Sequence, residues 1–178
     1  MVKYISPEDI EILASEVLRD CEKRTEENFC PVNISRVSKN LGCELELVDF
    51  DPKNISARVI KKSSDPKYTI QIARGKDIKR QRFSIAHEIA HIILHDQDDA
   101  ENEFVELRRS PLNYKPDELY NETQANMFAA ALLLLKKEVI SVWNSTKDIE
   151  EVADIFNISK EVVYNLSLIH ISEPTRPY

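Results

Sequence analysis

The sequence HEIAH at residues 87–91 constrains this chain more than any other feature. It lies in an apolar run, residues 82–95, that predicts a helix. Residues four apart on a helix share one face, with Cβ atoms about 5–6 Å apart, so His87 and His91 can bind one Zn²⁺. Glu88 is then placed to act as general base on a zinc-bound water. The alternative is a core helix without a site, but burying the charged Glu88 there is costly unless it is paired or metal-linked.

The composition indicates a single folded domain. The chain has 178 residues, of which 42% are hydrophobic and 31% charged, enough for a sizeable core. Its net charge of −7 argues against a dominant nucleic-acid surface. No apolar stretch approaches the roughly 18 residues of a membrane span, and the first residues do not form a basic-then-apolar secretion signal. Three cysteines without a CxxC pair favour reduced thiols, so we expect a cytoplasmic protein.

Hydrophobic periodicity predicts an α+β fold that begins with helices. Ser6 and Pro7 are typical of a helix start, and a shorter second helix is predicted over residues 33–41, before Gly42. Three alternating runs predict a small antiparallel three-stranded sheet, with strands over residues 44–50, 56–61 and 68–73.

The second half of the chain is predicted to be helical. The HExxH helix is expected to pack on a second long helix, from about Asp117 to Lys136 or beyond, that supplies another ligand. The remaining predicted segments are a solvated acidic loop over residues 96–106, a short helix near 139–144, and a final helix pair over 148–156 and 159–167.

Two histidines do not complete a catalytic zinc site, which usually has three protein ligands and an open position for water. His95 continues the spacing, but eight residues along a continuous helix separate it from His87 by about 12 Å. We therefore expect His95 to be a hydrogen-bonded partner of the site or a core histidine. Glu122 is the better candidate, because a Glu from a second helix completes a His₂Glu site. Asn126, one turn further on the same face, can hydrogen-bond the outer nitrogen of a ligand histidine. Taken by itself, however, Glu122 fits the surface of an amphipathic helix better than a metal site.

Two stretches of the chain resemble motifs of the ImmA/IrrE family of zinc metallopeptidases. Residues 82–95, RFSIAHEIAHIILH, resemble the family's RRFTxAHELGHxxLH segment. Residues 122–133, ETQANMFAAALL, resemble its ExxANxFAxxLL helix. The two motifs occur in the expected order, and the resemblance covers nearly the whole chain up to about Leu166.

The resemblance implies an intracellular zinc endopeptidase. By position, it makes His87, His91 and Glu122 the zinc ligands and Glu88 the catalytic acid and base. Mn²⁺ is a second candidate ion, because the same ligand types accept it. Members of the family, often encoded by mobile elements, cleave a helix-turn-helix transcriptional repressor. The expected partner is therefore such a repressor, with no direct nucleic-acid contact and no membrane.

The chain departs from the family motifs at two positions. Ala90 replaces the frequent Gly before the second histidine, and Leu135 stands where many members carry Pro, so the end of that helix is free to run on. Neither position holds a ligand.

The reaction is also expected to need a donor to the developing oxyanion, and the sequence does not choose between Tyr114 and Tyr120.

Residues 149–166 resemble a helix-turn-helix, which raises a second functional hypothesis. Residues 147–166 contain five acidic and two basic residues, a net charge of −3. A DNA reader needs basic residues near phosphates, so we favour packing or partner docking. The alternative is a DNA- or protein-binding transcriptional regulator with a metal-sensing HExxH site and no protease activity. A structural zinc site is disfavoured, because Cys21, Cys30 and Cys43 lack ligand spacing.

The predicted organisation has three parts. Residues 1–146 form the zinc metallopeptidase domain, and residues 147–166 form the helix-turn-helix-like segment packed on it. Residues 166–177, LSLIHISEPTRP, match the translation of a transposon-end sequencing adapter. We therefore interpret residues 167–178 as a tail that is not native.

Overall fold

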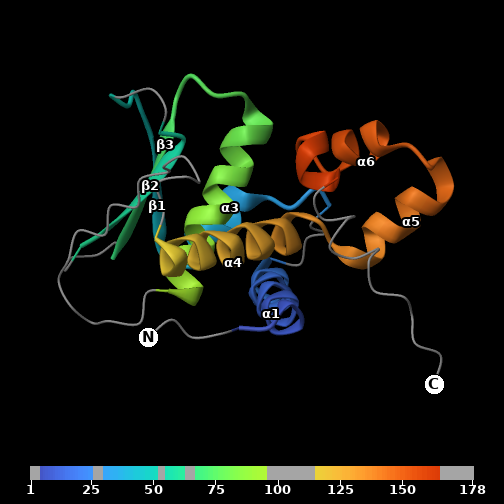
Figure 1. Cartoon of the computed structure of the whole chain (residues 1–178), viewed down its shortest axis with the longest axis horizontal. Coiled ribbons are helices and arrows are strands. Elements are labelled where there is room, and N and C mark those ends of the chain that lie inside the picture. The colour runs from blue at the N-terminus through green and yellow to red at the C-terminus, as the bar shows by residue number, and fades with distance from the viewer. Residues whose placement is uncertain (1–4, 26–29, 52–54, 63–66, 96–114, 165–178) are drawn as a thin grey trace.

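The structure is a computed structural model that describes residues 5–25, 30–51, 55–62, 67–95 and 115–164. It has the α+β class expected from the sequence (Figure 1). The elements, in chain order, are α1 (Pro7–Thr25), α2 (Ile34–Asn40), β1 (Cys43–Val48), β2 (Ala57–Lys61), β3 (Tyr68–Ala73), α3 (Ile78–Leu94), α4 (Pro116–Leu133), α5 (Lys136–Thr146) and α6 (Ile149–Ile155). Residues 160–164 form a further short helical segment. None of the helices among these residues is long and apolar enough to cross a membrane.

Side-chain caps fix where the first two helices begin. The Ser6 hydroxyl oxygen accepts a hydrogen bond from the Asp9 backbone N–H at 3.1 Å and so caps α1. The Asn33 side-chain oxygen accepts from the Arg36 N–H at 3.2 Å and caps α2. After α2 the chain turns at Gly42, whose φ of +73° is costly for residues with a Cβ.

The sheet is mixed, with strand order β1-β3-β2. β2 and β3 pair antiparallel as expected, but β1 pairs with β3 in parallel. The prediction of an all-antiparallel sheet is therefore wrong in one pairing. Parallel neighbours need a long crossover connection, and here residues 49–67, which include β2, provide it between β1 and β3. Alternation along a strand reports which side chains share a face, and it does not report which strand becomes the neighbour.

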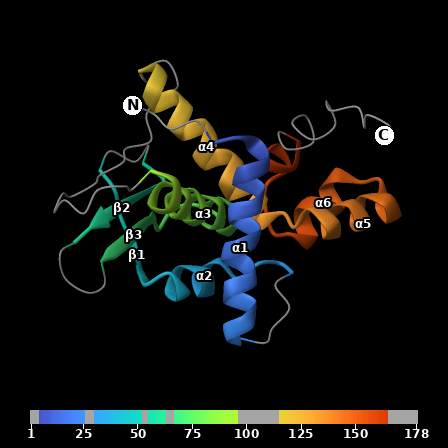
Figure 2. The ribbon, with the colours of Figure 1, turned by 90° about the horizontal axis from the view of Figure 1, so that it is seen from below.

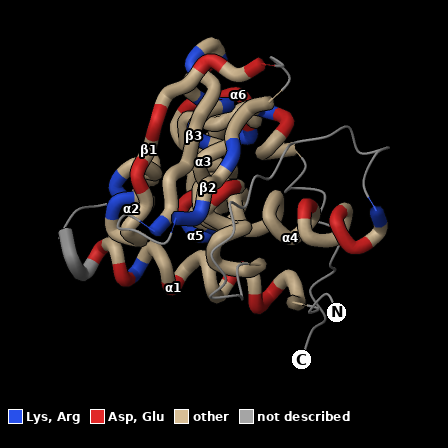
Figure 3. The backbone as a smooth tube through the Cα atoms, turned by 90° about the vertical axis from the view of Figure 1, so that its left-hand side faces the viewer, with Lys and Arg blue, Asp and Glu red and all other residues tan. Residues whose placement is uncertain are grey.

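The sheet face turned away from α3 carries a polar ladder across all three strands. Glu46, Gln71 and Arg58 lie at one register of the pairing. Arg58 Nε donates to Gln71 Oε1 at 2.7 Å, and Gln71 Nε2 donates to Glu46 Oε2 at 2.8 Å. Figure 3 shows the acidic positions along β1 and the basic positions along β2. These bonds join the three side chains into one network across the sheet.

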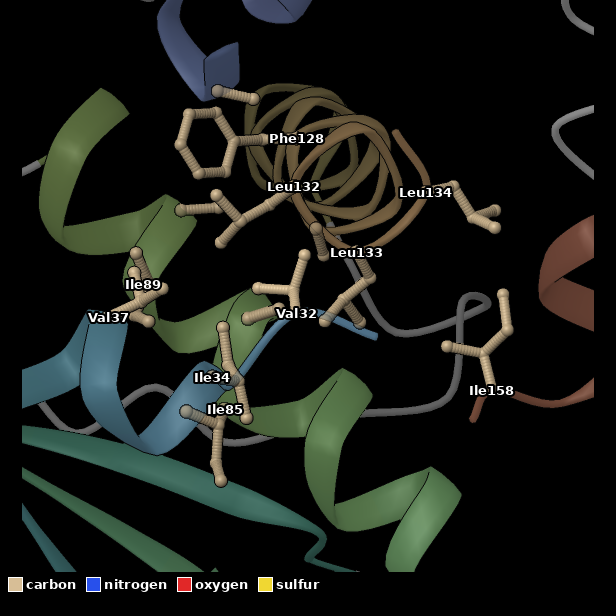
Figure 4. Packing of buried hydrophobic residues seen from close by; sticks show 14 of the residues in the cluster. Val32, Ile34, Val37, Ile85, Ile89, Phe128, Leu132, Leu133, Leu134 and Ile158 are labelled. Atoms are coloured by element: carbon tan, nitrogen blue, oxygen red, sulfur yellow. The ribbon is translucent and has the colours of Figure 1, made fainter. Parts of the chain in front are cut away.

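The helices are layered on the other face of the sheet. α3 contacts both β2 and β3 and also α4, and α1 packs on the far side of α4 (Figures 1 and 2). In Figure 4, Phe128 and Leu132 of α4 extend toward Ile89 of α3, with Val32 and Val37 nearby. The HExxH helix is thus enclosed by the sheet and α4, which places its polar residues inside the molecule.

The helix α4 ends earlier than predicted. It stops at Leu133, and Leu134 leaves the helical conformation with φ −113° and ψ +89°. The prediction that the helix continues to Lys136 or beyond is therefore wrong. Leu134 is only 6% exposed, and Figure 4 shows its side chain extending away from Leu133 toward Ile158. Consecutive buried leucines cannot all face one side of a helix, so packing in two directions ends α4 without a proline.

The C-terminal helices pack against the rest of the molecule. Buried side chains of this segment join the same hydrophobic cluster as α1, α3 and α4; they are Val152, Ala153, Phe156, Ile158 and Val163. Arg82 of α3 donates through Nε to the Asn157 carbonyl at 3.0 Å, and Lys79 pairs with Asp154 at 2.6 Å. The separate domain boundary at residue 147 stays a prediction, and residues 165–178, including the suspected tail, lie outside the described residues.

We expect Phe128→Ala to lower the free energy of unfolding by about 3–5 kcal/mol, because it removes a fully buried aromatic ring and leaves a cavity. Denaturant unfolding monitored by circular dichroism would measure the change. Ile140→Ala is the control, because Ile140 is 50% exposed on α5 and its truncation should change stability by less than about 0.5 kcal/mol. Equal losses in the two variants would contradict the placement of Phe128 at the centre of the core.

Candidate metal centre

The helix α3 brings three polar side chains into the interior. The Asp77 side chain accepts from the Arg80 N–H at 3.0 Å and caps the helix, which then runs without interruption to Leu94. Residues 84–91 are all buried, and the exposed fractions are 1% for His87, 2% for Glu88 and 2% for His91. Because the helix is regular, the two histidines lie one turn apart on the side that faces α4.

The helix α4 adds a carboxylate to the two imidazoles. Glu122 is 7% exposed; its Oε2 lies 3.3 Å from His87 Nε2, and its Oε1 lies 3.5 Å from His91 Nε2. The two Nε2 atoms are themselves 2.9 Å apart. These three residues form a group whose ligand atoms all lie within 4.8 Å of one another.

The donor set fits a tetrahedral metal ion. Bonds of about 2.0–2.2 Å to nitrogen and oxygen place neighbouring tetrahedral ligand atoms about 3.3–3.6 Å apart. The two separations that involve Glu122 fall in this range, and the separation between the histidines is a few tenths shorter. Glu122 Oε1 is buried without a hydrogen bond of ordinary geometry. Three Lewis-base atoms that converge in this way need a cation or shared protons between them, and His87, His91 and Glu122 can therefore hold a metal ion.

The outer nitrogen of each histidine is also engaged. His87 Nδ1 lies 3.0 Å from Asn126 Oδ1, an amide oxygen that only accepts. His87 therefore donates through Nδ1 and presents the lone pair of Nε2 to the other ligand atoms. His91 Nδ1 lies 3.0 Å from His95 Nδ1.

Two titratable groups of this region have shifted pKa values. Burial by itself would raise the pKa of Glu122, but hydrogen bonds and charge from His87 and His91 outweigh it and hold that pKa well below its usual range. Burial lowers the pKa of His95, partly opposed by its hydrogen bond to Gln124. The arrangement thus keeps Glu122 ionised and favours a neutral His95.

The sequence profile of the family described as Peptidase_M78, IrrE N-terminal-like domain, matches residues 38–166. The chain belongs to this family. The Peptidase_M78 match covers the HExxH segment, Glu122 and the C-terminal helices, and it identifies the chain as a member of a peptidase-type family.

One solved structure similar to this chain is a Mycobacterium tuberculosis transcriptional regulator. The two share 17% sequence identity with a TM-score of 0.63, over 98% of this chain and 49% of the regulator. At this identity the likeness shows a common fold alone, and this chain spans about half the length of that structure. No curated protein matched the sequence.

Of the residues singled out from the sequence, the structure brings together His87, His91 and Glu122, and it places Asn126 on the outer nitrogen of His87. It does not place His95 in the ligand group but behind His91. Glu88 directly follows His87 on α3, and its side chain is buried.

Of the two tyrosines considered as oxyanion donors, Tyr114 and Tyr120, the structure describes Tyr120. The hydroxyl of Tyr120 accepts from Gln124 Nε2 at 3.2 Å, which places it in the hydrogen-bond network behind His95. Tyr114 and the acidic segment 96–106 lie outside the described residues. The sequence reasoning missed Gln124, because it lies among other polar residues, Thr123 and Asn126 included, and no pattern singles it out.

Proposed function

We propose that this member of Peptidase_M78 is a zinc-dependent endopeptidase that hydrolyses a peptide bond in a partner protein. The observation that carries the proposal is the buried group of His87, His91 and Glu122, with Glu88 beside the first histidine on the same helix. A His₂Glu set leaves the fourth position of a tetrahedral ion open for water or substrate, as in catalytic zinc sites.

The residues of the chain have distinct parts in this reaction. A bound Zn²⁺ supplies a Lewis acid and lowers the pKa of a bound water toward neutrality. His87, His91 and Glu122 hold the ion, and Asn126 keeps the His87 ring in the tautomer that presents Nε2. The carboxylate of Glu88 accepts the proton of the attacking water and delivers it to the nitrogen of the leaving amine. The proton thus passes from the water to the new amine terminus through one carboxylate.

The proposed substrate is a helix-turn-helix transcriptional repressor. This proposal rests on the resemblance of the two motifs to those of the ImmA/IrrE family. On this proposal, cleavage of the repressor releases the genes that it silences, and the protein acts within the cytoplasm as an anti-repressor.

The C-terminal helix pair fits poorly with a role in reading DNA. Both its first helix and its turn contact α3, because Lys79 pairs with Asp154 of α6 and Arg82 binds the Asn157 carbonyl in the turn. Residues 147–166 carry a net charge of −3, which opposes binding to phosphates. We therefore assign this pair a packing role, and a gel shift at low salt that detected tight DNA binding would contradict the assignment.

The test is a cleavage assay with mass-spectrometric readout. The full chain, loaded with one equivalent of Zn²⁺, would be mixed with the helix-turn-helix repressor encoded nearest its gene. We expect a single cut in the repressor, and we expect the cut to disappear when the zinc is removed with a chelator and to return when zinc is restored. Bound zinc without a cut would overturn the substrate proposal, whereas failure to bind zinc would overturn the proposed function as a whole.

A further inference from the structure

A chain of hydrogen bonds leads from His91 to the N-terminal segment. His91 Nδ1 lies 3.0 Å from His95 Nδ1, and His95 Nε2 lies 3.2 Å from Gln124 Oε1. Gln124 Nε2 in turn lies 3.4 Å from the Ile5 carbonyl and 3.2 Å from the Tyr120 hydroxyl. Gln124 is only 2% exposed, so this amide is fixed by protein groups.

The direction of each bond in this chain follows from the Ile5 carbonyl, which can only accept. The amide nitrogen of Gln124 must face that carbonyl, so its oxygen faces His95 and accepts from His95 Nε2–H. A neutral imidazole carries one proton, which leaves His95 Nδ1 as an acceptor. His91 therefore donates through Nδ1, and its Nε2 presents a lone pair to the metal position.

Both ligand histidines are thus held by amide oxygens of α4, but by different routes. Glu122 and Asn126 are four residues apart and share the helix face toward α3, so Asn126 reaches His87 directly. Gln124 is two residues from each of them and lies on a different face. It cannot take the place that Asn126 has, and the ring of His95 spans the gap to His91.

We propose that His95 and Gln124 are positioning residues of the metal centre, which fix the tautomer and orientation of His91. This inference rests on the proposed function, because it assumes that His91 binds the metal ion. It assigns His95 a specific part, as an acceptor for His91, and it assigns Gln124 the part of selecting the His95 tautomer.

The test compares two substitutions at His95 by their zinc dissociation constants, measured by competition with a chromogenic chelator. His95→Asn keeps an acceptor, because Oδ1 takes about the position of Nδ1, whereas His95→Leu removes it. Loss of such an outer partner typically weakens metal binding about 10–100-fold. We expect that loss in His95→Leu, affinity within about threefold of the parent in His95→Asn, and a loss of about tenfold in Gln124→Met, a substitution of similar size without an acceptor oxygen.

A purely structural role is separated from a positioning role by a spectroscopic readout. Long-range ¹H–¹⁵N correlation spectra of the zinc-loaded protein should show His95 protonated on Nε2, and Gln124→Met should give mixed tautomers. Thermal unfolding of the metal-free variants measures any general loss of stability, and if His95→Leu does not fold, the Asn and Met variants decide. Parent-like zinc affinity in folded His95→Leu, or in Gln124→Met when the Leu variant does not fold, would overturn the inference, as would His95 protonated on Nδ1. Failure of the parent to bind zinc would instead overturn the proposed function, and the inference with it.

Discussion

Glu88→Gln should leave zinc bound and reduce the rate of repressor cleavage by about 10²–10⁴-fold, the usual contribution of a general acid–base group. The substitution keeps the size of the buried side chain but replaces the carboxylate by an amide, which cannot accept the proton of the attacking water. Because Glu88 is not part of the group formed by His87, His91 and Glu122, the zinc dissociation constant should not change. Single-turnover cleavage followed by mass spectrometry, together with a zinc titration of the same sample, measures both quantities.

The control for this prediction makes the same chemical change on the surface. Glu151 is exposed on α6, so Glu151→Gln should cleave at the parental rate. Cleavage by Glu88→Gln at the rate of this control would remove Glu88 from the mechanism, even if the metal site itself proved correct.

Glu122→Gln should weaken zinc binding by more than the roughly 10–100-fold expected for an outer hydrogen-bond partner. The carboxylate is buried, and His87 and His91 hold its pKa below the usual range, so it is ionised at neutral pH. Replacing it by a neutral amide removes the negative charge that compensates the ion while leaving the two imidazoles in place. Chelator competition at constant pH would measure the zinc dissociation constant, and cleavage should fall in parallel at limiting zinc.

A second variant on α4 separates this effect from a general change in charge. Asp117 is exposed in the first turn of the helix, and Asp117→Asn should bind zinc with parental affinity. If Glu122→Gln also kept that affinity, the third ligand would have to come from another part of the chain, and the acidic residues 96–106 would be the first to substitute.

The strands and helices of this fold differ in how far the sequence predicted them. Helical periodicity gave α3 and the first helix within a few residues, because each has a continuous apolar stripe and a capping side chain at its start. The end of α4 was missed, because nothing in the leucine run marks a break and the packing of Leu134 toward Ile158 decides it. The parallel pairing of β1 with β3 was missed for a related reason, because strand neighbours are chosen by the three-dimensional course of the connection.

The candidate site shows the same division. The helical spacing of His87 and His91 by itself places two imidazoles on one side of a helix, since four residues make about one turn. The assignment of Glu122 required the second motif, because a lone glutamate on an amphipathic helix fits the surface better than a metal site. His95 continues the spacing of His87 and His91, yet it lies outside the group that they form with Glu122, and it contacts His91 instead.

The sequence by itself determined the HExxH helix, the buried polar residues on it and the family to which its motifs point, because these depend on local spacing along the chain. Only the tertiary structure decided which other side chains complete the site around those residues. It is the packing of α4 on α3 that brings Glu122 to within 3.3 Å of His87 and joins Gln124 to His95. Such contacts join residues about 30 or more positions apart, and their geometry depends on the core that holds the two helices together, which no local pattern encodes.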